Sequence, residues 1–309
     1  MHSKILLFAL GIFIALSACT GSQQNNHTEG ETVTIVHSLG SVEIPQNPKR
    51  VVALDFSALE ILDYLDIKPV AIPKSGVPRH LSKYKDDTSI ADVGTVVEVN
   101  LEKINELQPD LIIIGGRLAD FYNDLSAIAP VMYPTVIGTD NFMAAFENNL
   151  NDFGKIFNKK EELNQALAAI QAKVDQIKEK TANSNERALI LLHNRGRFSA
   201  YGSGSRFGII HDVFGIKEAE KGMGTHLHGN PVSSEFIQKV NPDIIFIVDR
   251  SQIVGNDIMD KEEVENKLVK QTNAAKNGKI FYLNPEVWYL AGSGIASVNM
   301  MIDEINQVL

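Results

Sequence analysis

The chain has 309 residues, of which 44% are hydrophobic and 22% charged, and its formal net charge is −9. This acidic balance argues against nucleic acid or an anionic membrane surface as a partner. Residues 33–309 are numerous enough to form two domains of ordinary size.

The first residues have the pattern of an export signal. Lys4 precedes an apolar run over residues 5–16, which is too short to span a bilayer permanently, so residues 1–18 are expected to be a signal peptide. The tetrad that ends at Cys19, Leu-Ser-Ala-Cys, resembles the bacterial lipobox, which implies cleavage before Cys19 and lipid attachment to its thiol. Such a lipid anchors a protein without spanning the membrane. Cys19 is the only cysteine, which excludes an intramolecular disulfide, and loss of Lys4 changes the net charge from −9 to −10.

The sequence pattern of the remaining chain predicts two similar lobes, one on either side of a helical stretch. Residues 19–32 contain few apolar side chains and are expected to form a flexible tether. Over residues 33–141 a hairpin at 31–44 is followed by alternating strands and helices, which predicts a parallel sheet covered by helices. Residues 142–182 have helical periodicity and no proline, and we interpret them as a connector between lobes. The alternation resumes over residues 183–309.

An internal repeat supports this division. Residues 100–117 and 233–250 align without a gap, and each pairs an amphipathic helix with an apolar strand. The identical positions are Glu102/Glu235, Ile104/Ile237, Pro109/Pro242, Asp110/Asp243, Ile112/Ile245, Ile114/Ile247 and Arg117/Arg250. Ligands of parallel α/β sheets bind beyond the carboxyl ends of the strands. We therefore expect Arg117 and Arg250 to lie on opposite sides of a cleft between the lobes.

A third arginine belongs to the same hypothesis. Arg206 lies in the glycine-rich segment YGSGSRFG, where a helix is expected to begin and to add the positive end of its dipole. Three guanidinium groups around one cleft would favour an anion rich in oxygen. A single arginine after a strand is more often a surface salt-bridge partner, but the repetition of Arg117 and Arg250 favours a functional role.

Two histidines and a tyrosine are candidate metal ligands. His226 and His228 are two positions apart in a glycine-containing loop, so in an extended conformation only one would face the cleft. A solvated loop and a zinc site are the alternatives, although no cysteine or aspartate neighbour supports zinc. Tyr289 follows Trp288 in a predicted turn after the strand at 280–283. Its hydroxyl is either a buried packing group or, with an imidazole, a ligand for a hard ion such as Fe(III).

The other repeated charge is a carboxylate. Glu102 and Glu235 each fall in the first turn of a predicted helix, two residues after the expected caps Asn100 and Ser233. Stabilisation of the helix dipole explains them, and a two-point contact with a symmetric partner is the alternative. The chain has none of the G-x-S-x-G, H-E-x-x-H or P-loop signatures of enzymes.

Taken together, these features resemble one known family. The stretches SRFGIIHDV, HGNPVSSEF and VWYLA are similar to those of the substrate-binding lipoproteins of bacterial iron-siderophore ABC importers, especially the group that takes catecholate siderophores of the enterobactin type. The resemblance covers residues 35–309. It implies two Rossmann-like α/β lobes joined by a long helical connector, the fold of siderophore- and cobalamin-binding periplasmic proteins. It also implies no catalysis, no permanently bound cofactor and delivery of an Fe(III)-siderophore complex to a permease dimer with its ATPase.

The resemblance further implies roles for individual residues. The arginine triad that surrounds a ferric catecholate corresponds to Arg117, Arg206 and Arg250. Tyr289 and His228 match residues that ligate iron when a tetradentate chelate leaves two positions open, with His226 as the alternative. The family's permease-docking glutamates correspond to Glu102 and Glu235. The expected protein is a monomer in the periplasm or at the cell surface, anchored to a membrane through Cys19.

Two other functions compete with this one. A haem-binding transport lipoprotein of the same fold would also use tyrosine and histidine, but three arginines fit a polyanion better than the two propionates of haem. An enzyme acting on an exported phosphate or sugar substrate would need an acid–base pair, and the sequence offers none at useful spacing.

Overall fold

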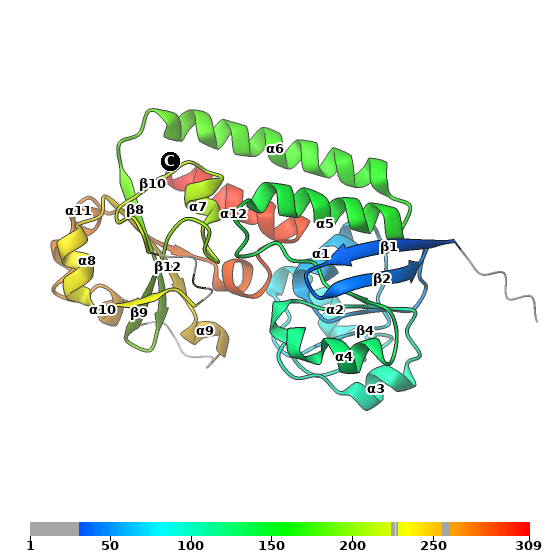
Figure 1. The fold of residues 1–309 in the computed structure, drawn as a ribbon. Helices are drawn as coiled ribbons and strands as arrows, with labels where there is room; N and C mark the ends of the chain where they lie inside the picture. The colour runs from blue at the N-terminus through cyan, green and yellow to red at the C-terminus, as the bar shows by residue number, and fades with distance from the viewer. Residues whose placement is uncertain (1–30, 224–225, 227, 255–259) are drawn as a thin grey trace, which may run out of the picture. The chain divides into compact units, whose positions relative to one another are not determined.

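The computed structural model describes residues 31–223, 226, 228–254 and 260–309 (Figure 1). The signal peptide, Cys19 and most of the tether lie outside this range and remain predictions. The described chain begins with an antiparallel hairpin, as the pattern over residues 31–44 predicted, formed by β1 (Thr32–His37) and β2 (Gly40–Pro45). No helix in the described part of the chain is both long and apolar enough to cross a membrane.

In the described chain the first lobe contains a parallel sheet of five short strands in the order β5-β4-β3-β6-β7. Its central strands are buried, as expected for near-continuous apolar runs covered on both faces. The strands are β3 (Val51–Ala53), β4 (Ala71–Ile72), β5 (Ala91–Asp92), β6 (Leu111–Ile113) and β7 (Val131–Met132). The helical segments are α1 (Phe56–Tyr64), η1 (Arg79–Leu81), α2 (Ser82–Asp86), α3 (Leu101–Glu106), η2 (Gly116–Phe121) and α4 (Tyr122–Ser126).

The second lobe has a mixed sheet in the order β11-β9-β8-β12-β13, with β10 also paired to β8. Its strands are β8 (Arg187–Asn194), β9 (Arg197–Tyr201), β10 (Lys217–Glu218), β11 (Asn230–Val232), β12 (Ile244–Asp249) and β13 (Ile280–Leu283). Strands β8, β12 and β13 are parallel, whereas β9 and β11 run antiparallel to their neighbours. The cause is the turn at Arg195 and Gly196, whose positive φ angles of 50° and 74° return the chain directly alongside β8.

Short helices connect the strands of the second lobe. They are α7 (Ile209–Asp212), α8 (Ser234–Val240), α9 (Ser251–Val254), α10 (Lys261–Val264), η3 (Val269–Gln271), α11 (Asn273–Lys276), the π-helical turn η4 (Glu286–Leu290) and the closing helix α12 (Ile295–Val308). Helix α7 is much shorter than the helix expected to begin at Arg206. The backbone N–H of Gly204 donates to Asp212 Oδ2 at 2.7 Å and holds the preceding segment in a tight turn. The predicted contribution of a long helix dipole at Arg206 is therefore wrong.

The helical stretch between the lobes consists of two helices that pack side by side, α5 (Phe142–Ile156) and α6 (Lys160–Ala182) (Figure 1). The break falls at Asn158, which adopts the left-handed conformation with φ 53°. Helix α12 packs against both α6 and α1, although the sequence places it in the second lobe. One cluster of buried apolar side chains continues from the first sheet through these helices to the second sheet. This shared core links the two lobes, and the boundaries after residues 141 and 182 remain predictions.

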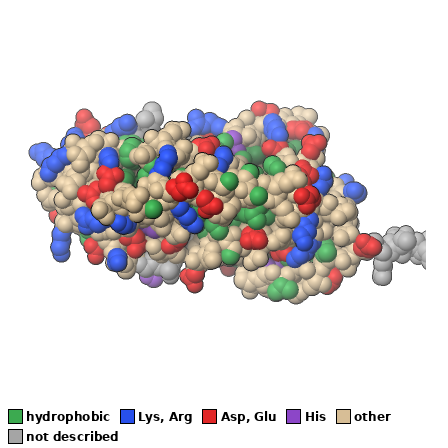
Figure 2. All heavy atoms as spheres, turned by 90° about the horizontal axis from the view of Figure 1, so that it is seen from above, with side chains coloured by type: hydrophobic (Ala, Val, Ile, Leu, Met, Phe, Trp, Pro, Cys, Tyr) green, Lys and Arg blue, Asp and Glu red, His purple; other side chains and the backbone are tan. Residues whose placement is uncertain are grey.

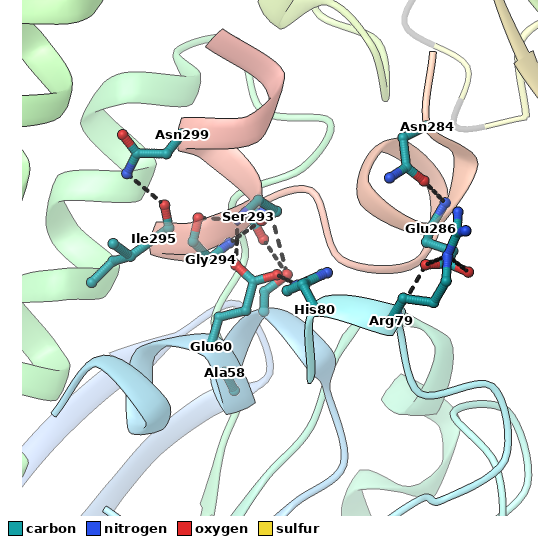
Figure 3. Close-up of polar contacts among 12 residues, drawn as sticks. Ala58, Glu60, Arg79, His80, Asn284, Glu286, Ser293, Gly294, Ile295 and Asn299 are labelled. Atoms are coloured by element: carbon teal, nitrogen blue, oxygen red, sulfur yellow. Dashed lines mark hydrogen bonds and ion pairs between the residues drawn. The ribbon is translucent and has the colours of Figure 1, made fainter. Parts of the chain in front are cut away.

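Buried polar contacts also join α1 to the C-terminal segment (Figure 3). The buried carboxylate of Glu60 accepts a hydrogen bond from Ser297 N at 2.7 Å and contacts His80 Nε2 at 2.8 Å. Nearby, Arg79 donates from its backbone N and from Nε to Glu286, at 2.9 and 3.1 Å. These contacts hold the start of α12 and the turn η4 against the first lobe.

Candidate functional site

A cavity of about 490 Å³ lies between the carboxyl end of the first sheet and the second lobe. Its volume is in the range of sites for small molecules. The first lobe lines it with residues that include Asp55, Arg117 and Tyr133, and the second lobe with Arg206, His228 and Tyr289.

Tyr289 is surrounded by three arginines. The guanidinium carbons of Arg117, Arg206 and Arg250 lie 5.3, 5.0 and 5.7 Å from the centre of its ring. Its backbone carbonyl accepts hydrogen bonds from Arg117 Nη2 at 2.5 Å and Arg206 Nη1 at 3.4 Å. Arg250 Nε donates to its hydroxyl at 2.9 Å. The tyrosine lies in the π-helical turn η4 instead of the simple turn predicted, and such turns often occur at functional sites.

The fold explains how distant segments meet here. Arg117 and Arg250 follow β6 and β12, so each lies at the carboxyl end of a parallel strand in its own lobe. Arg117, Arg206, Tyr289 and His228 line the cavity. Arg250 reaches Tyr289 but is not among the cavity-lining residues. Of the two exposed histidines, only His228 lines the cavity.

Two arginines, Arg117 and Arg206, bring positive charge to the cavity lining. Burial, followed by the nearby charge of Arg117, lowers the pKa of Arg206, because each disfavours another positive charge. Burial also raises the pKa of the neighbouring Tyr201 to about 12, so this phenol is neutral at ordinary pH. An oxygen-rich anion would relieve the repulsion among the three guanidinium groups.

Asp55 and Asn149 are among the polar cavity residues that were not identified from the sequence. Asp55 follows β3 and caps α1, with Oδ1 accepting from Ala58 N at 3.1 Å. It ends the segment RVVALD, so the rule that identified Arg117 and Arg250 at strand ends would also have found it. Asn149 lines the cavity from α5, and its sequence context contains no signal for this role.

The rest of the first-lobe wall is mainly apolar. Val97, Tyr133, Val136 and Ile137 are among the residues that line it. Val97 is 58% exposed and so offers apolar surface to a ligand. A cavity that combines apolar surface with cations suits a ligand with both aromatic surface and negative charge.

Glu102 and Glu235 occupy matching positions in the two lobes but lie outside the cavity lining. Each is exposed in the first turn of its helix, after the predicted caps. Asn100 Oδ1 accepts from Lys103 N at 2.9 Å, and Ser233 Oγ accepts from Phe236 N at 3.3 Å. Hydrogen bonds, first from its own backbone N–H and then from Ser233, lower the pKa of Glu235. Both side chains are exposed and accessible to a partner.

Within the described residues, no group of three or more His, Cys, Asp or Glu side chains is arranged to hold a metal ion. His228 and Tyr289 nevertheless both line the cavity and offer an imidazole and a phenol oxygen. Two such donors fit an iron whose other ligands come from a bound chelator.

The fold and cavity define a two-lobed solute-binding protein. The family model described as periplasmic binding protein matches residues 51–287, and the chain belongs to this family. The petrobactin-binding protein YclQ of Bacillus subtilis is 39% identical to it, with 99% of this chain and 98% of the relative covered. The ferric-anguibactin-binding protein FatB of Vibrio anguillarum is 38% identical, with coverage of 88% and 86%. The solved catecholate-siderophore binding protein VctP of Vibrio cholerae has a TM-score of 0.85 and 32% identity over 90% of this chain and 100% of its own.

These relationships confirm the predicted family and two-lobed α/β fold. They also confirm that the chain is a transport binding protein and not an enzyme. Membership of this family indicates a protein that acts outside the cytoplasm. The roles of the individual site residues remain predictions.

Proposed function

We propose that this protein binds a ferric siderophore of the catecholate type in the cavity and delivers it to an ABC permease with its ATPase. The observation that carries the proposal is the convergence of three guanidinium groups on Tyr289. The similarity to a petrobactin-binding protein and to a ferric-anguibactin-binding protein supports a ferric siderophore as the ligand.

The charge and surface of the cavity match this ligand class. A ferric tris-catecholate carries a charge of about −3, and guanidinium groups in a partly desolvated cavity attract such an anion strongly. The apolar wall formed by Val97, Tyr133, Val136 and Ile137 offers packing surface for its aromatic rings. The acidic and basic side chains on the face drawn in Figure 2 are interspersed, with no continuous basic patch there for nucleic acid.

His228 and Tyr289 are the proposed iron ligands for a tetradentate chelate. Such a chelate occupies four of the six positions of Fe(III), and an imidazole nitrogen and a phenolate oxygen complete the shell. His228 is preferred to His226 because it lines the cavity. A hexadentate chelate would bind through the arginines alone.

Haem is the alternative ligand. Its two propionates carry a charge of about −2, which balances three guanidinium groups less well than the charge of about −3 on a ferric tris-catecholate. A largely apolar slot would suit haem, whereas Arg117 and Arg206 both line this cavity. The charge balance therefore favours the ferric catecholate.

Fluorescence of Trp288 provides the test. This buried indole precedes Tyr289 and donates from Nε1 to Glu304 at 2.7 Å. Titration with a ferric enterobactin-type chelate, haem and free Fe(III) should quench its emission most strongly with the chelate. Tight haem binding without chelate binding would overturn the proposal.

The remaining features describe a tethered carrier. We propose that residues 1–18 are removed, that lipid on Cys19 anchors the protein to a membrane, and that the chain acts as a monomer. The exposed Glu102 and Glu235 lie at equivalent positions of the two lobes, which suits a contact with the two halves of a permease dimer.

A further inference from the structure

The lining of the cavity includes hydrogen-bond acceptors that cannot pair with an anionic ligand core. Asp55 is one of them, and it lines the cavity on the same wall as Arg117. Its Oδ1 atom accepts the N–H of Ala58, and its Oδ2 atom packs against Gly115, where a Cβ would lie only 2.2 Å from that oxygen. Only a residue without a Cβ can approach this carboxylate so closely.

Asn149 is the second acceptor. It is only 6% exposed, and its Oδ1 has no hydrogen-bond partner among the described residues. Buried side-chain acceptors are nearly always paired, so an unpaired one needs an explanation. Asn149 lines the same cavity as Asp55 but comes from a separate element, α5. Two separate elements thus contribute side chains with acceptor atoms to the lining of one cavity.

The negative charge of the Asp55 carboxylate is not fully balanced by donors and cations within the protein. Burial raises its pKa, although hydrogen bonds from Ala58 and Ser57 and the charge of Arg117 act in the opposite direction. The carboxylate therefore lacks enough donor groups to offset its desolvation. A donor carried by the ligand, and a cationic one above all, would supply what is missing.

We propose that Asp55 and Asn149 form a subsite for an amine nitrogen, bound as an ammonium group, in the linker of the siderophore. The inference rests on the proposed function and refines its ligand class. The ligand is a chelate whose iron-binding oxygens face Arg117 and Arg206, while its linker donates N–H groups to Asp55 and Asn149. The positive charge of the ammonium group also offsets the negative charge of Asp55, which would otherwise repel the anionic core of the ligand.

The test uses two ferric chelates with identical catecholate groups, one with a secondary amine in its linker and one with a methylene at that position. Trp288 fluorescence gives the Kd of each for the mature protein. The wild-type protein should bind the amine chelate at least about 10-fold more tightly than the methylene chelate, because hydrogen bonds between charged groups are strong. Asp55→Asn should abolish this difference in Kd between the two chelates. Asparagine also caps helices well, so α1 keeps its start.

Two further variants make the result specific. Asn149→Leu, which removes the acceptor without changing charge, should reduce the preference several-fold. Asp152→Asn is the matched control, because Asp152 is a carboxylate on the same helix that does not line the cavity. It should keep the full preference.

The outcomes are distinct. Equal binding of both chelates by wild type would overturn this inference alone, as would an equal loss of both in Asp55→Asn or a loss of preference in Asp152→Asn. If wild type bound neither chelate, the proposed function itself would fail, and the inference with it.

Discussion

Arg250 Nε donates a hydrogen bond of 2.9 Å to the hydroxyl oxygen of Tyr289. Arg117, from the other lobe, donates to the backbone carbonyl of the same tyrosine. Tyr289 is thereby held at the point where the charged ends of both lobes meet. A ligand that reaches this tyrosine contacts the cations of both lobes at once.

Arg250→Gln should weaken binding of a hexadentate ferric tris-catecholate by about 10- to 100-fold, the effect of losing one hydrogen bond between charged groups. A ferric chelate of lower charge should lose less, because the missing interaction is mainly electrostatic. Isothermal titration calorimetry measures both affinities. Arg197→Gln is the matched control, since Arg197 is exposed on β9 and does not line the cavity. Equal losses for both chelates would contradict an electrostatic role for Arg250.

Tyr289→Phe combined with His228→Ala should abolish the shift of the charge-transfer band when a tetradentate ferric bis-catecholate binds. The physical reason is that the double variant removes both proposed protein donors to iron. Visible absorption and circular dichroism spectra report this directly. A hexadentate chelate is the control, because its iron has no open position and its spectrum should not change. An unchanged band for the tetradentate chelate in the double variant would rule out direct ligation.

Glu102→Ala with Glu235→Ala should impair iron import in cells and leave the Kd for the chelate in solution unchanged. Both side chains are exposed and outside the cavity lining, so their loss should affect only docking. Uptake of radioactive iron and fluorescence titration measure the two properties separately. Glu161→Ala with Glu179→Ala, two exposed glutamates of α6, is the control for lost charge. A parallel loss of affinity would refute the docking role.

Asp55→Asn should raise the melting temperature of the ligand-free protein at pH 8. Burial raises the pKa of Asp55 above its ordinary value of 3.8, so its ionised form costs stability in the folded state. That cost is fully present above the raised pKa, decreases as the pH falls through it, and is lost below 3.8, where the carboxyl is protonated in both states. The difference between variant and wild type should therefore shrink with falling pH. A difference that grows towards acid pH would show that the carboxylate stabilises the fold.

Gly115→Ala should destabilise the protein by about 1–3 kcal/mol, the usual cost of overpacking. A Cβ at this position would lie 2.2 Å from Asp55 Oδ2 and 3.0 Å from its Cγ. Gly116→Ala is the matched control, because its Cβ would meet only the Tyr133 hydroxyl, at 3.6 Å. Denaturant unfolding should distinguish the neighbouring glycines clearly. Equal stabilities would mean that Asp55 moves aside freely.

Several features followed from local sequence. The hairpin over residues 31–44 and the helix caps Asn100 and Ser233 depend on residues close together in the chain. Hydrophobic periodicity and capping act over a few positions, so they can be recognised without the tertiary structure. The repeat that ends at Arg117 and Arg250 placed both arginines at strand ends for the same reason.

Other features required the tertiary structure. The antiparallel course of β9, the shortness of α7 and the packing of α12 on α1 result from contacts between segments far apart in the sequence. No sequence signal marked Asn149 as a cavity residue.

Short-range pattern and repetition thus encode the types of elements, the two-lobed plan and the cationic strand ends. Packing of distant segments brings Arg206, Asp55 and Asn149 together with Arg117 and Tyr289 around one cavity. Local patterns do not encode this arrangement, because burial and charge compensation are properties of the space between elements. That space arises only when α1, α5 and η4 pack together.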